Sequence, residues 1–342
     1  MAWLLKVATL ASLSTVVLGD GDTCVELGSS SCASSKESCC HGDCVDDTCV
    51  VGYTGGGCSV IGPRDGNLVM QFLAMGDSPY DSVADPPLYE GHQYNCIRDS
   101  MVPGVAQMDP TPAFLAHIGD IKRGNATGTD DSCNRRLFDS RRNLFARFEE
   151  MIDFLLVVGD NEWNECSGFV PDTNPDPVKQ LWRHKFTTPP FRSLDHNKEA
   201  HKLQRQSGYP ENFFFRQSGV AFLGITEPGG DHASDDVNRN WTDSKLTTKH
   251  DAIVIFAHAG VSNTIINGLR NYFERHGAVA TLVVKGNTHP STFCLEHDPT
   301  FKTDNVLTLT VEPFQASPLL VSLYEVDSKI FFAVDSAGIG CS

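Results

Sequence analysis

Five polar side chains stand where runs of apolar residues end, and their types are those that bind divalent metal ions. They are Asp77, Asp120, Asp160, His258 and His289. Carboxylate oxygens and imidazole nitrogens together suit Zn, Mn or Fe. Ions held in this way make water a nucleophile near neutral pH. The residue types therefore predict a metal-dependent hydrolase.

The apolar runs before these residues predict the buried strands that position them. Each run is short, carries β-branched or aromatic residues and stops at or near glycine, which is typical of a buried strand. Residues just beyond the carboxyl ends of such strands form the sites of layered α/β proteins. We therefore expect one shared rim at the ends of five stretches. These are Leu68–Asp77, Phe114–Asp120, Phe154–Glu162, Ile253–His258 and Val279–His289.

The remaining pattern predicts two sheets packed face to face, with helices outside. Apolar residues at helical spacing predict helices at Arg135–Phe154, Pro175–Phe186 and around Ile265–Arg275. Further strands are expected at Val220–Thr226, Val306–Val311, Leu319–Val326 and Ile330–Val334. We expect a loop with a short helix at residues 78–112, loop and helix over 163–216, and a polar loop at 227–250.

Length and charge limit the classes of function. The chain has 342 residues, enough for one large domain and a small one, and its 40% apolar content can build a core. The formal net charge of −16 disfavours nucleic acids and anionic membrane surfaces as partners. The same charge repels an anionic substrate unless bound cations reverse the local field.

The amino terminus predicts export. Residues 1–19 combine a lone Lys6, an apolar stretch and small residues at the end, which is typical of a cleaved signal peptide. An anchor helix is the alternative, but the apolar core is short for spanning a membrane. We expect a secreted protein without membrane insertion. The sequons at Asn125 and Asn240 are compatible with a glycoprotein.

Residues 20–62 form a predicted cysteine-rich module. Seven of the twelve cysteines lie between Cys24 and Cys58, and few large apolar residues separate them. Disulfides must hold so small a segment, and they are favoured over a zinc site because only His41 lies in the cluster. The module is a candidate for binding a cell-wall glycan or a protein, and a plain spacer is the alternative. The catalytic domain is expected over residues 63–342.

The ordered motifs resemble the calcineurin-like metallophosphoesterase superfamily, which includes the purple acid phosphatases. The resemblance rests on the order GD, GD, GDNE, H and GxxH, and covers residues 67–335. The stretches GDSPY, HIGDIK and GDNEW are similar to a secreted or microbial branch with GDxPY, HxGDIK and GDNEW signatures. The resemblance implies a four-layer αββα sandwich of the α/β (α+β) class, with a two-metal site at the strand ends.

The resemblance also implies a role for each candidate ligand. Asp77 and His289 match ligands of the first metal, Asp120 matches the bridging carboxylate, and His258 matches a ligand of the second metal. Asp160 stands where the family usually has a metal-binding Asn. The implied cofactors are two divalent or trivalent ions, drawn from Fe, Zn or Mn, and occupancy by a single ion is left open.

Besides Asp160, four positions depart from the family pattern. Pro79 and Asn287 each replace a metal-binding His, and Asn161 replaces the His that acts on the leaving group. Arg123 stands where purple acid phosphatases have a Tyr. An amide cannot give up a proton near neutral pH. We still count Asn161 and Asn287 among the candidate metal ligands, and Asn161, Asp120 and His258 as the candidate catalytic residues.

The resulting hypothesis is a secreted phosphoesterase in which a metal-bound hydroxide attacks a small phosphate ester, with monoesters favoured over diesters. The alternative is a degenerate relative that binds a ligand or glycan without catalysis, which Pro79, Asn161 and Asn287 favour. A nuclease or phosphodiesterase of the same fold is third, and the acidic surface argues against nucleic acid as its substrate.

Residues near the motifs have simpler predicted roles. Glu162 is expected to orient ligands, and His117 to lie in the core. Trp163 is expected to pack around the rim of the site, with stacking on the substrate as the alternative. Arg123, Arg141 and Arg142 are expected at the solvated surface, with contact to phosphate as the alternative. Cys133 and Cys166 flank one predicted helix, and we expect them to form a disulfide.

Overall fold

The structure is a computed structural model. It describes residues 43–45, 48–50, 66–79, 92–124, 133, 135–166, 177–187, 203–228, 235–287, 294–297, 306–311 and 317–339. The chain divides into two compact units, Met1–Gly52 and Tyr53–Ser342. In the first, β1 (Asp43–Val45) pairs antiparallel with β2 (Thr48–Val50). The predicted signal peptide and most of the predicted cysteine-rich module lie outside the described residues, and the boundary at residues 62–63 stays a prediction.

The first sheet of the larger unit has five strands in the order β14-β13-β3-β4-β5. Three of them are parallel neighbours, β3 (Asn67–Met75), β4 (Phe114–His117) and β5 (Asp153–Leu156). Antiparallel β13 (Leu319–Val326) and β14 (Lys329–Ser336) complete it. In register, Met75 lies opposite His117, which lies opposite Leu156. The segments carrying Asp77, Asp120 and Asp160 therefore leave the sheet at one edge.

The second sheet has seven strands in the order β11-β12-β10-β9-β8-β7-β6. Its parallel centre is β8 (Val220–Gly224), β9 (Ala252–Phe256), β10 (Ala280–Lys285) and β12 (Val306–Thr310). The antiparallel strands at its edges are β11 (Cys294–His297), β7 (Tyr209–Gln217) and β6 (Gln204–Gln206). His258 follows the central strand β9 by two residues.

Aromatic side chains from both sheets fill the space between them. Phe72 and Phe114 of the first sheet stack with ring centroids 5.0 Å apart. Phe114 meets Phe222 of the second sheet edge to face at 5.3 Å, and Phe215 stacks on Phe222 at 4.7 Å. All four are fully buried. Interlocking rings of this kind add to the stability gained by burying apolar area, and they hold the two sheets face to face.

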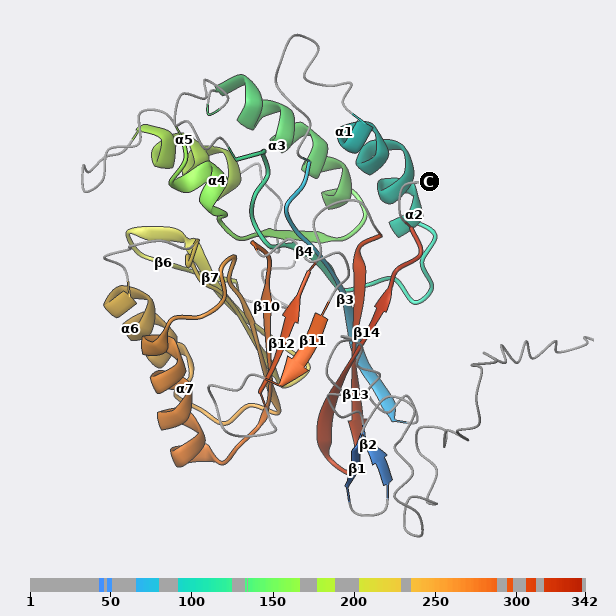
Figure 1. The fold of residues 1–342 in the computed structure, drawn as a ribbon, viewed down its shortest axis with the longest axis vertical. Coiled ribbons are helices and arrows are strands. Elements are labelled where there is room, and N and C mark those ends of the chain that lie inside the picture. Colours follow the sequence, from blue (N-terminus) through green and yellow to red (C-terminus); the bar gives the residue numbers. More distant parts are fainter. Residues whose placement is uncertain are drawn as a thin grey trace, which may run out of the picture. The chain divides into compact units, whose positions relative to one another are not determined.

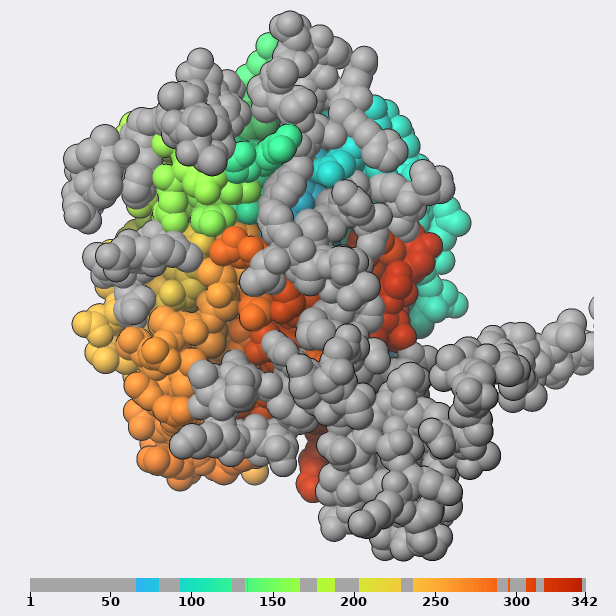
Figure 2. Space-filling view, viewed as in Figure 1, coloured from blue at the N-terminus to red at the C-terminus, as the bar shows by residue number. Residues whose placement is uncertain are grey.

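Helices cover the outer face of each sheet, which makes four layers (Figure 1). The first sheet carries α1 (His92–Cys96), η2 (Ile97–Met101), α2 (Val102–Val105), α3 (Arg135–Glu149) and α5 (Pro177–Phe186). The second carries α6 (Asp235–Lys245) and α7 (Asn263–His276). In the space-filling view, the green atoms of α3 and α5 lie above the orange atoms of α7 (Figure 2). The fold is the αββα sandwich that the motif resemblance implied.

Two predictions of local structure were wrong. The stretch 227–250 is not only a polar loop, because it contains α6. Two polar residues of this helix, Asn238 and Thr242, are buried, so no apolar stripe marks it. The stretch 163–216 contains β6 and β7 as well as a helix. Strand β7 is buried on both faces, so it lacks the alternation that marks a half-buried strand.

Two further expectations concern a crosslink and membranes. Cys133 and Cys166 form the expected disulfide, with Cα atoms 5.4 Å apart. It joins the segment before α3 to the end of the segment that follows α4 (Asp160–Trp163). Among the helices that the structure describes, none combines the length and hydropathy needed to cross a bilayer.

Candidate metal centre

Tight turns at the strand ends aim the carboxylates into the site. Asp77 and Asp120 adopt left-handed backbone conformations, with φ of 51° and 56°. Asp and Asn enter this region more readily than other residues with side chains. The peptide N–H of Asp77 donates to the carbonyl of Gly119 at 3.0 Å, which joins the two turns. Strained backbone is common at functional sites, where the surrounding structure holds it.

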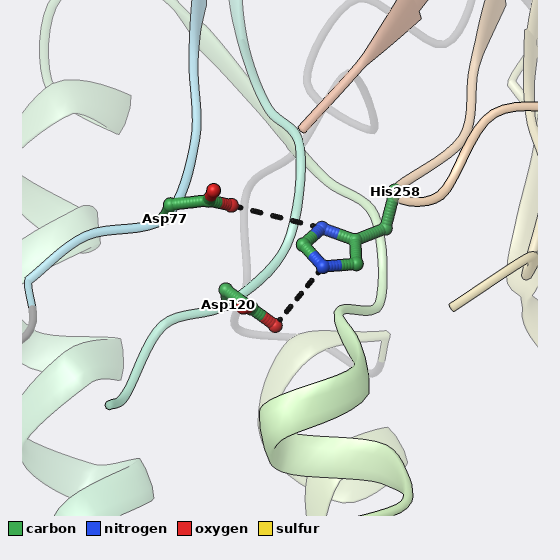
Figure 3. A group of neighbouring side chains, drawn as sticks. All are labelled: Asp77, Asp120 and His258. Carbon is green, nitrogen blue, oxygen red and sulfur yellow. Dashed lines mark ion pairs between the residues drawn. The ribbon is translucent and has the colours of Figure 1, made fainter. Parts of the chain in front are cut away.

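His258 crosses from the second sheet to the acids of the first (Figure 3). Its Nδ1 lies 2.7 Å from the carbonyl oxygen of Ile118, which can only accept, so Nδ1 carries a proton and donates. Its Nε2 lies 3.2 Å from Oδ1 of Asp120 and 3.2 Å from Oδ1 of Asp160. A metal-binding histidine is oriented in the same way, with one ring nitrogen fixed by an acceptor and the other facing the ion.

The cluster has the donors and the space that a divalent ion needs. One ligand atom from each of Asp77, Asp120 and His258 lies within 4.8 Å of the others, and all three residues are buried. Glycines keep the surroundings open. A Cβ on Gly286 would lie 2.8 Å from Oδ1 of Asp77, and one on Gly159 would lie 2.2 Å from Oδ1 of Asp120. Two carboxylates and an imidazole in such a cradle fit Zn, Mn or Fe.

Burial and the closeness of the acids to His258 shift the pKa values of the cluster. Burial raises the pKa of Asp77 to about 7, although His258 acts in the opposite direction. Burial disfavours the charged form of His258, but hydrogen bonds with Asp120 and Asp160 raise its pKa well above the usual value. Burial also favours a higher pKa for Asp160, yet the hydrogen bond with His258 outweighs it and the pKa is lowered. Protons thus supply the compensation that a bound cation would supply.

Glu162 holds the turns that carry the acids. It is fully buried on α4, and its Oε1 accepts the peptide N–H groups of Gly159 at 2.7 Å and Asp120 at 3.2 Å. Its Oε2 accepts the N–H of Ile121 at 3.2 Å. Burial, together with the nearby Asp120 carboxylate, raises the pKa of Glu162 to about 8. Both oxygens are engaged with backbone, which is the orienting role expected of it.

Of the three remaining predicted ligands, the structure describes Asn161 and Asn287 but not His289. Asn161 donates its backbone N–H to Oδ1 of Asp120 at 3.0 Å, while its side-chain Nδ2 donates to the carbonyl of Lys122 at 3.0 Å. Asn287 has φ of 64° and donates its backbone N–H to Oδ2 of Asp77 at 3.2 Å. His289 lies outside the described residues. The metal-binding and catalytic roles of these three stay predictions.

Sequence reasoning was wrong about the two arginines of α3. Arg141 is 1% exposed and donates to backbone carbonyls beside the site. Arg142 is also largely covered, with a side chain 15% exposed that lies 3.6 Å from Glu149. No signal in the local sequence separates these residues from surface arginines. His117 is buried as expected, with its ring centroid 5.2 Å from that of Phe145. Trp163, which was expected at the rim, is 5% exposed and packs with the core residues of the first sheet.

Comparisons with known proteins give distant likenesses only. No family model matches the chain, and no curated protein is similar to it. Among solved structures, a 5'-nucleotidase from Candida albicans is 14% identical with a TM-score of 0.45, over 78% of this chain and 52% of that one. Vacuolar Protein Sorting 29 from Cryptosporidium parvum is 12% identical with a TM-score of 0.24, over 79% of this chain and 97% of that one. This chain thus spans about half of the nucleotidase.

The fold and the cluster together define the class of site. A sandwich of two sheets brings acids from β3, β4 and β5 to one imidazole from β9. The arrangement offers oxygen and nitrogen ligands for a metal ion at the ends of buried strands, where layered α/β proteins place their sites.

Proposed function

We propose that this protein is a secreted, metal-dependent phosphoesterase of the calcineurin-like superfamily that hydrolyses small phosphate monoesters. The orientation of His258 carries the proposal, because its Nδ1 is fixed by the Ile118 carbonyl while its Nε2 faces Asp120 and Asp160. The motif order supports the superfamily. Export rests on residues 1–19 and on the cysteine content, and both are features of sequence.

Asp77, Asp120, Asp160 and His258 are the proposed ligands, with His289 completing the set. When bound, one or two ions would lower the pKa of water and neutralise charge that develops on a phosphoryl group. The chain itself contributes fixed geometry. Glu162 holds the turns of Asp120 and Gly159, and the peptide N–H of Asn287 holds Asp77. Burial of Asp77, Asp120 and His258 keeps water from competing for their charges.

The choice of substrate follows from Asn161. It occupies the position that acts on the leaving group in the family, and its amide cannot donate a proton as an acid. Esters whose leaving groups need no proton should therefore react best, which favours aryl over alkyl phosphates. The cysteine-rich module, proposed to bind a cell-wall glycan or protein, would place this activity near its target.

The test is hydrolysis of p-nitrophenyl phosphate by the purified chain after treatment with a chelator and after addition of Mn, Zn or Fe. We expect turnover that the chelator stops and one of the metals restores, and none in Asp120→Asn. A folded wild-type chain that shows no turnover with any of these metals would overturn the proposal. If it also holds less than one metal ion per chain, the non-catalytic binding protein becomes the better account.

A further inference from the structure

A buried arginine lies behind the cluster and joins the two segments that carry its first two acids. Arg141 stands in the middle of α3, on the outer face of the first sheet, and is 1% exposed. Its Nε donates to the carbonyl oxygen of Ile121 at 2.8 Å, and its Nη2 donates to that of Pro79 at 3.3 Å. Ile121 directly follows Asp120, and Pro79 follows Asp77 by two residues.

The sheet alone does not fix these segments relative to each other. The pairing of β3 with β4 ends at Met75 and His117, before either acid. Past that point, two backbone hydrogen bonds join the segments directly after the strands. The N–H of Ile118 donates to the carbonyl of Met75 at 2.7 Å, and the N–H of Asp77 donates to that of Gly119 at 3.0 Å. The guanidinium of Arg141 joins the two segments again after the acids, at the carbonyls of Pro79 and Ile121. Each turn is therefore held both before and after its acid.

The chemistry of the side chain suits this task. A guanidinium presents several donors in one rigid plane, so it can bond two carbonyls at a fixed separation, whereas an ammonium is a compact point charge on a flexible stem. Burying a charge is costly unless it is compensated, so a buried arginine bonded to backbone is placed there for a reason beyond apolar packing. Its positive charge also lies close enough to the site to add to the effect of burial, which lowers the pKa of His117.

We propose that Arg141 is a positioning residue that sets the separation of Asp77 and Asp120, and with it the affinity of the site for a metal ion. The inference rests on the proposed function. Residues that orient metal ligands from outside typically change metal affinity by about 10–100-fold when they are replaced. Arg142, its neighbour on the same helix, contacts Glu149 instead and provides a matched control.

The test measures Mn²⁺ binding by electron paramagnetic resonance of the free ion, with circular dichroism and thermal unfolding as checks of folding. For Arg141→Lys, which keeps the charge but not the fork, we expect a Kd about 10–100-fold above wild type and a retained fold. For Arg142→Lys we expect a Kd within about twofold of wild type, because lysine keeps the charge and the ion pair of Arg142 with Glu149 lies within α3. Arg141→Met removes the charge as well and should weaken binding at least as much as Arg141→Lys.

Each other result has a definite meaning. Equal Mn²⁺ affinity in wild type and a folded Arg141→Lys overturns the positioning role and leaves the proposed function standing. Wild-type protein that binds no Mn²⁺, Zn²⁺ or Fe overturns the proposed function and this inference with it. If Arg141→Lys and Arg141→Met both fail to fold while Arg142→Lys folds, Arg141 supports the fold rather than the site, and the inference is wrong.

Discussion

Strand β9 has a buried histidine at each end, and the two lie in opposite electrostatic surroundings. His258 follows the strand and is fully buried, and His250 precedes it and is 4% exposed. Burial, with Arg216 and His276 nearby, lowers the pKa of His250 to about 4, although Asp251 acts the other way. Burial acts on His258 in the same sense, but Asp120 and Asp160 raise its pKa well above the usual value.

The difference shows that burial alone does not mark a functional histidine. At His250 the ring packs against Tyr272, with centroids 6.2 Å apart, and staying neutral costs nothing at pH 7. At His258 carboxylates from the other sheet make positive charge favourable. The carboxylates around His258 therefore favour a positive charge at that end of β9, whereas burial favours a neutral ring at His250. The following predictions use this contrast.

The largest expected effect is on catalysis. His258→Asn removes a proposed ligand, so we expect phosphatase activity with Mn to fall by roughly 100-fold or more, since even residues outside the ligand shell cost about 10–100-fold. His250→Asn should retain activity within about threefold. Steady-state assays on p-nitrophenyl phosphate compare the two. A similar loss in both folded variants would contradict the distinction between the two ends of β9.

The next effect is stabilisation by metal. A ligand that binds only the folded state at 100 times its Kd stabilises by about 2.7 kcal/mol. Added Mn²⁺ should therefore raise the melting temperature of wild type and of His250→Asn alike. His258→Asn should show little or no shift at the same concentration. Differential scanning fluorimetry gives the answer, and an undiminished shift in His258→Asn would place the ion elsewhere.

The third effect concerns pH and is the smallest. Because the folded pKa of His250 is about 4 and the unfolded value is about 6.5, the unfolded state binds a proton first as pH falls. The contribution of His250 to the free energy of unfolding is therefore complete above pH 6.5 and is lost as the pH falls towards 4. The loss between pH 7 and pH 5 is about 2 kcal/mol. Urea unfolding should show this loss to be smaller by that amount in His250→Gln. Parallel curves for the two proteins would mean that His250 is not held neutral.

The strands and the main cluster could be predicted because their signals are local. The apolar run of β3 ends next to Asp77 and that of β9 next to His258, so chain order places both at strand ends. Parallel pairing of β3, β4 and β5 then brings three acids to one edge. Glycine and aspartate after an apolar run are enough to mark such a turn.

Other features could not be predicted because they depend on contacts between distant parts of the chain. Buried Asn212 of β7 accepts a bond from the N–H of Thr226 at 2.7 Å and donates to Asn238 of α6 at 2.8 Å. All of these side chains are polar, so the sequence around α6 lacks an apolar pattern and predicts a loop. Arg141 is hidden for the same reason, because its two acceptors are backbone carbonyls 20 and 62 residues away.

The central claim is that acids from one sheet and the imidazole from the other share a metal ion. Its most direct test is anomalous diffraction from crystals soaked in Mn²⁺ or Zn²⁺, recorded at the absorption edge of the metal. We expect a peak about 2.0–2.2 Å from Nε2 of His258 and from a carboxylate oxygen of Asp120. Density that lies only away from His258, or a well-ordered soaked crystal without a peak at this cluster, would contradict the account.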